Sequence, residues 1–353
     1  MKILIAGNLG YIGPVVVSHL RAALPGAVLA GFDTGWFAHC LAGSVVLPET
    51  DLDVQYFGDV RELPEEALRD VDAVVNLAAV SNDPMGKRFE TVTAEINHEA
   101  ALTLAASAKA AGVKRYVFAS SCSVYGWAED GARTEQSEVA PETAYARSKV
   151  AAEEGLVDLA GPEFQVTCLR FATACGMSPR LRLDLVLNDF VAAAVTSKRI
   201  VVLSDGSPWR PLIHVRDMAL AIEWAVRREA DNGGESLLVN TGADAWNCQV
   251  SDLAAAVVTA IPSTVVEINQ DALLDRRSYR VDFSLFKKLA PDYVPRMDLA
   301  AAISDLEMGL QEMDFEESDF RKSAWIRLNV LAKHVERGVL TPDLRWQDKS
   351  RVA

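Results

Sequence analysis

The sequence predicts an α/β fold, in which a doubly wound parallel sheet of the Rossmann type is interleaved with a smaller lobe. Short apolar segments rich in β-branched residues alternate with longer Ala- and Leu-rich segments through the first half of the chain. A glycine-rich turn directly follows the first apolar segment, and the alternation fades after about Gly176. Strands that alternate with helices are typical of right-handed crossovers, which bury a parallel sheet between two layers of helices.

The predicted strands of the main sheet are segments of apolar and β-branched residues. They comprise residues 2–6, 27–32, 54–57, 73–80, 115–120, 165–171 and 236–241, the last of which is expected to return to the main sheet. Helices are predicted at residues 14–24 and 91–111, because a proline suits the first turn of the former and a glycine follows the latter. A helix at residues 184–196 and a strand at residues 200–203 indicate the smaller lobe.

Composition and charge exclude several classes of protein. The 353 residues are 50% hydrophobic and 24% charged, as in an ordinary globular chain, and the net charge is −14. This charge disfavours binding to nucleic acid or to an anionic membrane surface. Five cysteines without a CxxC pair and five scattered histidines predict neither a disulfide framework nor a metal site. The first apolar segment is too short for a signal peptide or a membrane span, so we expect a cytoplasmic protein.

Three glycines after the first predicted strand form a GxxGxxG pattern. Gly7, Gly10 and Gly13 allow the backbone to approach a pyrophosphate, and the following helix offers free amide groups at its N-terminus. Asp33 lies 20 residues beyond Gly13, where a carboxylate accepts hydrogen bonds from adenosine ribose hydroxyls. Each signal alone also fits an ordinary turn or a helix cap, but together they predict a dinucleotide site. No Lys or Arg occurs in residues 22–60 to neutralise a 2′-phosphate, which favours NAD over NADP.

A tyrosine and a lysine lie four residues apart in an Ala-rich segment that we predict to be helical. Tyr145 and Lys149 would then share one helix face, and the ammonium group would lower the pKa of the phenol and make it a general acid and base. The same spacing also fits a solvated helix face. Ser121 ends the fifth predicted strand at the carboxyl edge of the sheet, where its hydroxyl could hydrogen-bond a reacting oxygen, with a capping serine as the alternative.

Together these motifs resemble the extended short-chain dehydrogenase/reductase family, specifically its NAD-dependent nucleotide-sugar epimerases and dehydratases. The resemblance also rests on Asp59 after the third predicted strand, Asn76-Leu-Ala-Ala79 after the fourth, and Ser120-Ser-Cys-Ser-Val-Tyr-Gly126. It covers residues 1 to about 282. It implies that NAD is the cofactor, that a nucleotide-diphosphate sugar is the substrate, and that residues 91–111 and 145–159 join two copies in a homodimer.

The resemblance also assigns roles to individual residues. Ser121, Tyr145 and Lys149 would form the catalytic triad. Cofactor contacts are implied for the glycines, Tyr145, Lys149 and a further set, comprising Tyr11, Ile12, Asp33, Asp59, Val60, Leu77, Ala78, Ala79 and Asn97. Asp59 and Val60 would flank the adenine, and Asn97 would hold the nicotinamide side. Substrate contacts are implied for Ser121, Ser123, Thr173, Asn188, Arg210, Arg276 and Arg277. Among these, arginine suits the sugar-nucleotide diphosphate because it binds phosphate in a bidentate manner.

Departures from the family pattern limit the reactions that we expect of this chain. Sugar 4,6-dehydratases of the family carry an Asp-Glu pair where this chain has Cys122 and Ser123, so dehydration is disfavoured. Thr173 stands where the family often has an asparagine, and residues 178–184 are an elaboration expected to line the sugar pocket. We therefore predict an epimerase that oxidises carbon 4 transiently to a 4-keto intermediate. The alternatives are an NAD(P)H-dependent 4-ketoreductase of a 4-keto-6-deoxy nucleotide sugar and a non-catalytic dinucleotide sensor.

The motifs also indicate the domain boundaries. Residues 1–176 would form the NAD-binding Rossmann domain, to which residues 213–242 would return. Residues 177–212 and 243–353 would form the substrate-binding lobe. One lobe would thus hold NAD and the other the sugar nucleotide.

Overall fold

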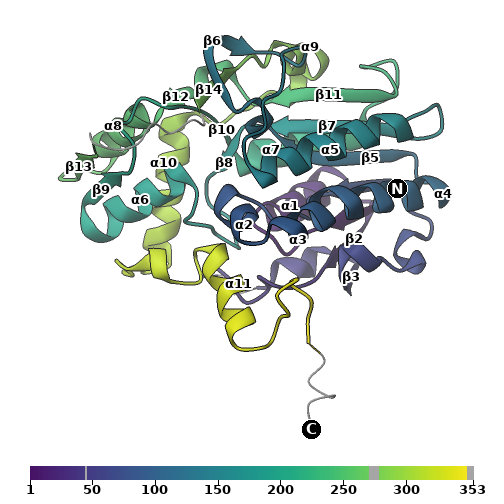
Figure 1. Ribbon diagram of the computed structural model, residues 1–353, viewed down its shortest axis with the longest axis horizontal. Helices are drawn as coiled ribbons and strands as arrows, with labels where there is room; N and C mark the ends of the chain where they lie inside the picture. Colours follow the sequence, from purple (N-terminus) through teal and green to yellow (C-terminus); the bar gives the residue numbers. More distant parts are fainter. Residues whose placement is uncertain (44–45, 270–277, 348–353) are drawn as a thin grey trace.

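A seven-stranded parallel sheet forms the centre of the molecule (Figure 1). The computed structural model describes residues 1–43, 46–269 and 278–347. The strands lie in the order β11-β7-β5-β4-β1-β2-β3. Their bounds are β1 (Lys2–Ala6), β2 (Val28–Asp33), β3 (Val54–Phe57), β4 (Ala73–Asn76), β5 (Arg115–Ser121), β7 (Gln165–Phe171) and β11 (Ser236–Thr241). Because the chain order reverses between β1 and β4, the carboxyl ends of these strands flank the crevice where ligands of such folds bind.

Helices cover both faces of the sheet, as a parallel sheet requires. On one face α1 (Gly13–Ala23) packs against α7 (Val215–Arg227), and on the other α4 (Ala100–Ala110) packs against α5 (Ala144–Leu159). Successive residues of β1 alternate between two buried apolar clusters, one on each face. The predicted Rossmann-type fold is confirmed, and each of the predicted sheet strands is present within four residues of its expected bounds.

Two elements differ from the sequence-based expectation. The predicted helix at residues 91–111 is interrupted, because a π-helical turn, η4 (Glu95–Glu99), joins α3 (Glu90–Ala94) to α4. Such turns occur frequently at functional sites. The fourth strand ends at Asn76 rather than at residue 80, because the chain leaves the sheet there at its carboxyl edge. Both departures lie beside the crevice.

The smaller lobe consists of short strands and longer helices. Its strand pairings are β8 (Thr173–Cys175), β10 (Trp209–His214) and β12 (Asn247–Gln249), then β9 (Arg199–Val202) with β13 (Val265–Ile268), and β6 (Trp127–Arg133) with β14 (Ser278–Val281). Its long helices, which pack on one another, are α6 (Val186–Ser197), α8 (Val250–Ala260) and α10 (Leu299–Glu312). Two shorter helices pack on the main sheet domain, α2 (Asp83–Arg88) against α5 and α9 (Ser284–Leu289) against β11. The lobe is interleaved with the sheet, since β11 returns the chain to β7 between its elements.

The C-terminal segment, residues 327–347, packs against the main sheet domain. It begins with α11 (Arg327–Glu336), drawn in yellow in Figure 1. Leu331, Leu340 and Leu344 are buried in the apolar cluster shared with α4 and the neighbouring strands. Burying one leucine side chain contributes about 1.5–3 kcal/mol, so three of them favour this position strongly. This differs from the expectation that all of residues 243–353 belong to the substrate-binding lobe.

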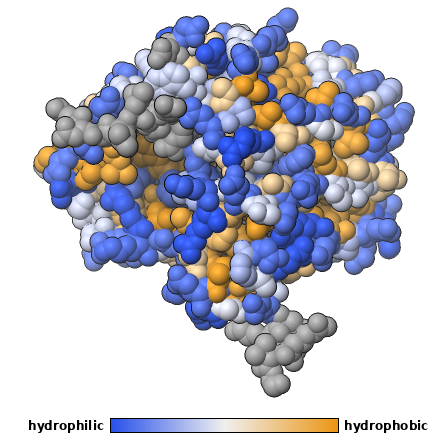
Figure 2. Space-filling view, in the orientation of Figure 1, coloured by the Kyte–Doolittle hydropathy of each residue, from blue (hydrophilic) through white to orange (hydrophobic). Residues whose placement is uncertain are grey.

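The surface has the polar character that the composition predicts. Hydrophilic residues predominate on the face of the molecule shown in Figure 2. Within the described ranges, no helix combines the length and the apolar character needed to cross a membrane. The five cysteines are all free thiols.

The packing of the C-terminal segment can be tested with a cavity-forming substitution. We expect Leu331→Ala to lower the free energy of unfolding by about 2–4 kcal/mol, because large-to-small changes at buried sites leave a cavity. Leu331 is 1% exposed, whereas Leu203 is 82% exposed. Leu203→Ala is therefore the control and should change the free energy by less than about 0.5 kcal/mol. Urea unfolding followed by circular dichroism measures both, and equal effects would contradict this packing.

Candidate active site

A single pocket at the carboxyl edge of the sheet gathers most of the predicted site residues. Those that line it are Gly7, Gly10, Tyr11, Ile12, Gly13, Asp33, Asp59, Val60, Leu77, Ala78, Ala79, Ser121, Ser123, Tyr145, Lys149 and Thr173. They come from the turns after β1, β2, β3 and β4, from the end of β5, from α5 and from β8. The pocket therefore extends from the main sheet to the edge of the smaller lobe.

The glycine turn forms one wall of this pocket through its backbone. Gly7 has a φ of +86°, and a Cβ placed there would lie 2.5 Å from the amide nitrogen of Ala78. A Cβ on Gly13 would lie 2.2 Å from the carbonyl oxygen of Asn8. Only glycine fits at either position, and α1 starts at Gly13 with its first amide groups beside the pocket. Such a cradle is suited to a pyrophosphate, which amide groups and the helix dipole attract.

Asp33 ends β2 and fastens the glycine turn to the next strand. Its two carboxylate oxygens accept hydrogen bonds from the backbone amides of Leu9, at 3.0 Å, and Gly35, at 2.7 Å. Burial raises the pKa of Asp33, and these two hydrogen bonds act in the opposite direction. The carboxylate lies on the pocket wall, where contact with a ribose hydroxyl remains a prediction.

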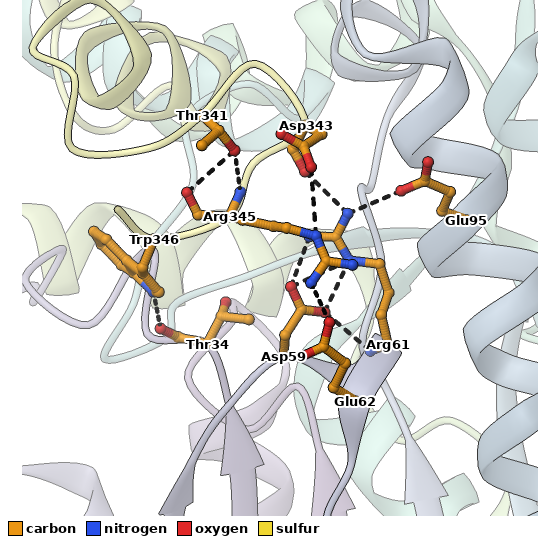
Figure 3. Close-up of polar contacts among 9 residues, drawn as sticks. All are labelled: Thr34, Asp59, Arg61, Glu62, Glu95, Thr341, Asp343, Arg345 and Trp346. Atoms are coloured by element: carbon orange, nitrogen blue, oxygen red, sulfur yellow. Dashed lines mark hydrogen bonds and ion pairs between the residues drawn. The ribbon is translucent and has the colours of Figure 1, made fainter. Parts of the chain in front are cut away.

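Asp59 lies on the same side of the pocket but already has a cationic partner. Its carboxylate accepts from the guanidinium of Arg61, at 2.6 Å, and Arg61 also pairs with Glu95, at 2.9 Å (Figure 3). Asp59 also caps the short 3-10 helix η2 (Val60–Glu62). The ion pairs hold the turn after β3 against η4, and the predicted contact of Asp59 with the adenine remains a prediction.

The three predicted catalytic residues meet in the middle of the pocket. Tyr145 and Lys149 occupy the first turns of α5, which is capped by Thr143, whose hydroxyl accepts from the amide of Ala146 at 3.1 Å. The Tyr145 phenol is hydrogen-bonded to the side chain of Ser121 at the end of β5. Lys149 Nζ lies 5.7 Å from the centroid of the Tyr145 ring. A phenol, a hydroxyl and an ammonium group in this arrangement can exchange a proton with a ligand oxygen.

The ionisation of this group differs from the sequence-based expectation. Burial raises the pKa of Tyr145 to about 12, while the hydrogen bond from Ser121 and the charge of Arg182 act to lower it. Burial also lowers the pKa of Lys149 to about 8. The Lys149 ammonium donates to the carbonyl oxygen of Ala119, at 2.7 Å, and does not bring the pKa of the phenol down to neutral pH. The loss of hydration on burial outweighs the nearby charges.

Two residues that were predicted to contact ligands are hydrogen-bonded to protein groups. Asn97 is fully buried in η4, where its amide exchanges two hydrogen bonds with the backbone of Val80, at 2.8 and 3.0 Å. Asn188 is fully buried in α6, where its amide donates to the hydroxyl of Tyr11, at 3.0 Å, and accepts from the amide of Gly176, at 3.0 Å. Neither residue lines the pocket. Their polar groups are paired with protein groups, and the predicted ligand contacts of Asn97 and Asn188 stay predictions.

Of the three predicted phosphate-binding arginines, only Arg210 lies within the described residues. Arg210 lies in β10, donates to its neighbouring carbonyl at Trp209, at 2.9 Å, and does not line the pocket. Arg276 and Arg277 lie outside the described residues.

Sequence reasoning did not assign a role to three charged residues that line the pocket, namely Asp83, Arg182 and Arg327. Arg182 lies within residues 178–184, which were expected to line the sugar pocket, and it pairs with Asp184 at 2.8 Å. Arg182 also donates to the hydroxyl of Ser81, at 2.8 Å. No spacing pattern connects these residues to the glycine turn, so only the tertiary structure brings them to the pocket.

The comparison with family models decides the family. A model of the NAD-dependent epimerase/dehydratase family matches residues 3–242, which is more than half of the chain. The chain belongs to the NAD-dependent epimerase/dehydratase family. NAD is the cofactor of this family, and the pocket fits a dinucleotide because of its cradle of glycines, the start of α1 beside it and the Asp33 carboxylate.

Relatives within the epimerase/dehydratase family include both reaction types. The chain is 30% identical to the UDP-glucose 4-epimerase of Streptomyces lividans over 264 residues, which cover 68% of this chain and 75% of the relative. It is 28% identical to a dTDP-glucose 4,6-dehydratase of Streptomyces griseus over 253 residues, which cover 70% and 74% respectively. Both act on nucleotide sugars, as their names state. A nucleotide-sugar epimerase or dehydratase is therefore supported, without a choice between the two.

A solved structure shows the same fold. The UDP-glucose-4-epimerase of Stenotrophomonas maltophila, with bound NAD and formylated UDP-arabinopyranose, superposes with a TM-score of 0.76 at 23% identity. The match covers 89% of this chain and 99% of that one. The fold shared by the two proteins includes both lobes, because so much of each chain is covered.

The cradle of the epimerase/dehydratase pocket can be tested at Gly13. We expect Gly13→Ala to lower the free energy of unfolding by about 1–3 kcal/mol and to weaken NAD binding, because the added methyl group overlaps backbone atoms of the turn. Gly26→Ala is the control, since a Cβ there meets no atom within 4 Å. Thermal unfolding and titration with NAD measure the two effects. Unchanged NAD affinity in Gly13→Ala would show that the turn does not hold the cofactor.

Proposed function

We propose that this protein is a 4-epimerase of a nucleotide-diphosphate sugar. The observation that carries the proposal is the meeting of Ser121, Tyr145 and Lys149 in the dinucleotide pocket. The two residues after Ser121 carry no carboxylate. Proton exchange at a sugar hydroxyl is supported by the triad, and elimination of water lacks its usual acid and base at these positions.

Cys122 does not replace the missing acid. Its side chain is fully buried, its thiol donates to the carbonyl oxygen of Arg170, at 3.1 Å, and burial raises its pKa. A buried thiol of this kind keeps its proton at neutral pH and cannot act as a general acid. Ser123 faces the pocket, but a hydroxyl without a neighbouring base is a poor general acid. The geometry therefore favours reversible oxidation over dehydration.

Each residue of the triad would have a distinct task. Reversible hydride transfer is the chemistry that NAD supplies when bound. Tyr145, in its phenolate form, would take the proton from the 4-hydroxyl group and later return it. Ser121 would orient the reacting oxygen, because its hydroxyl is already bonded to the phenol. Lys149, held by the carbonyl oxygen of Ala119, would stabilise the negative charge of the phenolate.

Epimerisation also requires that the 4-keto sugar present both of its faces, so the pocket must leave it room to turn. The pocket lining includes small side chains, namely Ala119, Ser121, Ser123, Ala172, Thr173 and Ala174, beside larger ones such as Phe171 and Tyr279. The small side chains favour a turning intermediate over a rigidly held one. Diphosphate binding by Arg210, Arg276 and Arg277 is part of the same proposal.

The reaction can be identified from the product. Incubation of the purified protein with UDP-glucose, UDP-galactose, UDP-glucuronic acid and dTDP-glucose, without added cofactor, should yield a mixture of 4-epimers from one of them. Chromatography separates the epimers, whose mass equals that of the substrate. A product lighter by one water molecule would show a dehydratase, and steady consumption of added NADH would show a ketoreductase.

The role of Tyr145 is tested by removing one oxygen atom. Tyr145→Phe should lower the turnover number, measured at saturating NAD, by about 100-fold or more, because the phenol moves the proton. Tyr293→Phe, outside the pocket, is the control and should keep full activity. If Tyr145→Phe retained the wild-type turnover number, the assignment of the proton acceptor would be wrong.

The shifted pKa values of Tyr145 and Lys149 predict how the turnover number depends on pH. The reactive form carries a Tyr145 phenolate and a Lys149 ammonium, with pKa values of about 12 and about 8. Below pH 8 the ammonium is present and the phenolate fraction rises about tenfold per pH unit, so the turnover number should rise. Above pH 8 the loss of the ammonium cancels the gain in phenolate, so the turnover number should level off. A profile of turnover number against pH that is flat below pH 8 would contradict this coupling.

The homodimer and the cytoplasmic location stay predictions. α4 and α5 pack against each other, and Val157 on α5 is an exposed apolar residue on the surface proposed for the dimer. Light scattering coupled to size-exclusion chromatography measures the mass in solution.

A further inference from the structure

Arg327 lines the cofactor pocket although it lies more than 300 residues from the glycine turn. It is the first residue of α11, and its side chain is 1% exposed. Its guanidinium lies 5.0 Å from the ring centroid of Phe37, which also lines the pocket. The family model ends at residue 242, so the motifs of the family do not account for this arginine.

The charge of Arg327 has no carboxylate partner among residues 1–43, 46–269 and 278–347. Its two terminal nitrogens donate to the carbonyl oxygens of Arg180, at 2.7 Å, Leu181, at 3.0 Å, and Ala324, at 3.2 Å. Its Nε has no hydrogen-bond partner, and among the residues that the structure describes no carboxylate lies within 4.0 Å of the guanidinium. A buried cation is unfavourable unless an anion compensates it. Arg327 therefore favours the binding of an anion in the adjacent pocket.

The partners of Arg327 can be compared with those of three other buried arginines. Arg180 is paired with Glu49, at 2.6 Å, and Arg182 with Asp184, at 2.8 Å. Arg228 lies away from the pocket, and all of its nitrogens donate to carbonyl or hydroxyl oxygens. Arg327 differs from the first two because it lacks a carboxylate, and from Arg228 because its Nε is unpartnered beside a pocket. Burial and the charges of Arg182 and Arg180 lower the pKa of Arg327 to about 10, so it is still charged at neutral pH.

Two of the three carbonyl groups that hold Arg327, those of Arg180 and Leu181, belong to a segment bonded to the glycine turn. Ser178, two residues before Arg180, donates its hydroxyl to the carbonyl oxygen of Tyr11, at 2.6 Å. Tyr11 itself lies between Gly10 and Gly13. The guanidinium is thus linked through residues 178–181 to the turn whose amides are suited to a pyrophosphate.

We propose that Arg327 is a cofactor-binding residue whose guanidinium pairs with the diphosphate group of bound NAD. Amide groups of the glycine turn and the guanidinium from the C-terminal segment would then share the phosphate oxygens. Arginine suits this task because its planar group offers several donors to phosphate oxygens at once. The proposal depends on NAD as the cofactor and is independent of whether the sugar is epimerised or dehydrated.

Hydrogen bonds attach the C-terminal segment, residues 327–347, to the protein beside the cofactor pocket (Figure 3). Arg61 donates to the carbonyl oxygen of Asp343, at 3.0 Å, and also pairs with Asp59, a pocket residue. The indole of Trp346 donates to the carbonyl oxygen of Thr34, at 2.6 Å, directly after Asp33. These bonds attach the segment to the turns after β2 and β3, which line the cofactor pocket. Arg327 is therefore held by a braced segment and not by a free chain end.

The test uses the full chain stripped of nucleotide, and compares the wild type with Arg327→Gln. Calorimetric titration with NAD⁺ and with ADP-ribose should show affinities about 10- to 100-fold lower in the variant, the effect of one lost charge-assisted contact. The affinity for adenosine, measured by displacement of NAD⁺, should stay within about twofold, because adenosine carries no phosphate. Arg337→Gln, at the exposed residue that directly follows α11, is the control and should bind all three ligands as the wild type does.

Other outcomes would overturn the proposal. Equal losses for adenosine and ADP-ribose would assign Arg327 to the fold of the pocket, and a loss restricted to NADP⁺ would assign it to a 2′-phosphate. Weaker binding of UDP with unchanged NAD⁺ affinity would assign it to the substrate. If Arg327→Gln does not fold, Arg327→Lys carries the test, because it keeps the charge without the planar donors. The lysine variant should bind ADP-ribose more weakly than the wild type and adenosine equally well, and equal ADP-ribose affinity would refute the contact.

Discussion

The close approach of the backbone at the glycine turn is the constraint on which the rest of the structure depends. A Cβ at Gly13 would overlap the carbonyl group of Asn8, and one at Gly7 would overlap the backbone of Ala78. The turn, the start of α1 and the residues after β4 can therefore meet only where no side chains intervene. This contact lies at the reversal of strand order, so one wall of the pocket consists of backbone amides.

The helix that carries Tyr145, α5, is held against the sheet by buried charged side chains. Lys149 donates to the carbonyl oxygen of Ala119 in β5. One turn later, Glu153 pairs with Arg170 of β7, at 2.7 Å, and both side chains are buried. Breaking such a pair is costly, because the remaining charge would have no compensation. The position of the phenol relative to Ser121 is thus set by contacts that other residues of the same helix make with β5 and β7.

The net charge of the whole chain differs in sign from the charges of several side chains buried beside its pocket. The chain carries −14 overall, yet Arg180, Arg182 and Arg327 are buried close to one another beside a site for an anionic cofactor. Two of them are neutralised by carboxylates, so their role is to brace the wall. An acidic chain can still place arginines beside an anionic cofactor, because charges separated by more than about 10 Å of solvent are largely screened.

The sequence by itself determined the order of strands and helices, the glycine turn, the position of Asp33 and the spacing of Tyr145 and Lys149. These features depend on local patterns of residues, which a single chain displays directly. Only the tertiary structure decided that Asn97 and Asn188 bind protein groups, that burial raises the pKa of Tyr145, and that Arg327 reaches the cofactor pocket. Each of these depends on burial or on contacts between residues far apart in the chain, and no local pattern records which distant group fills a given space.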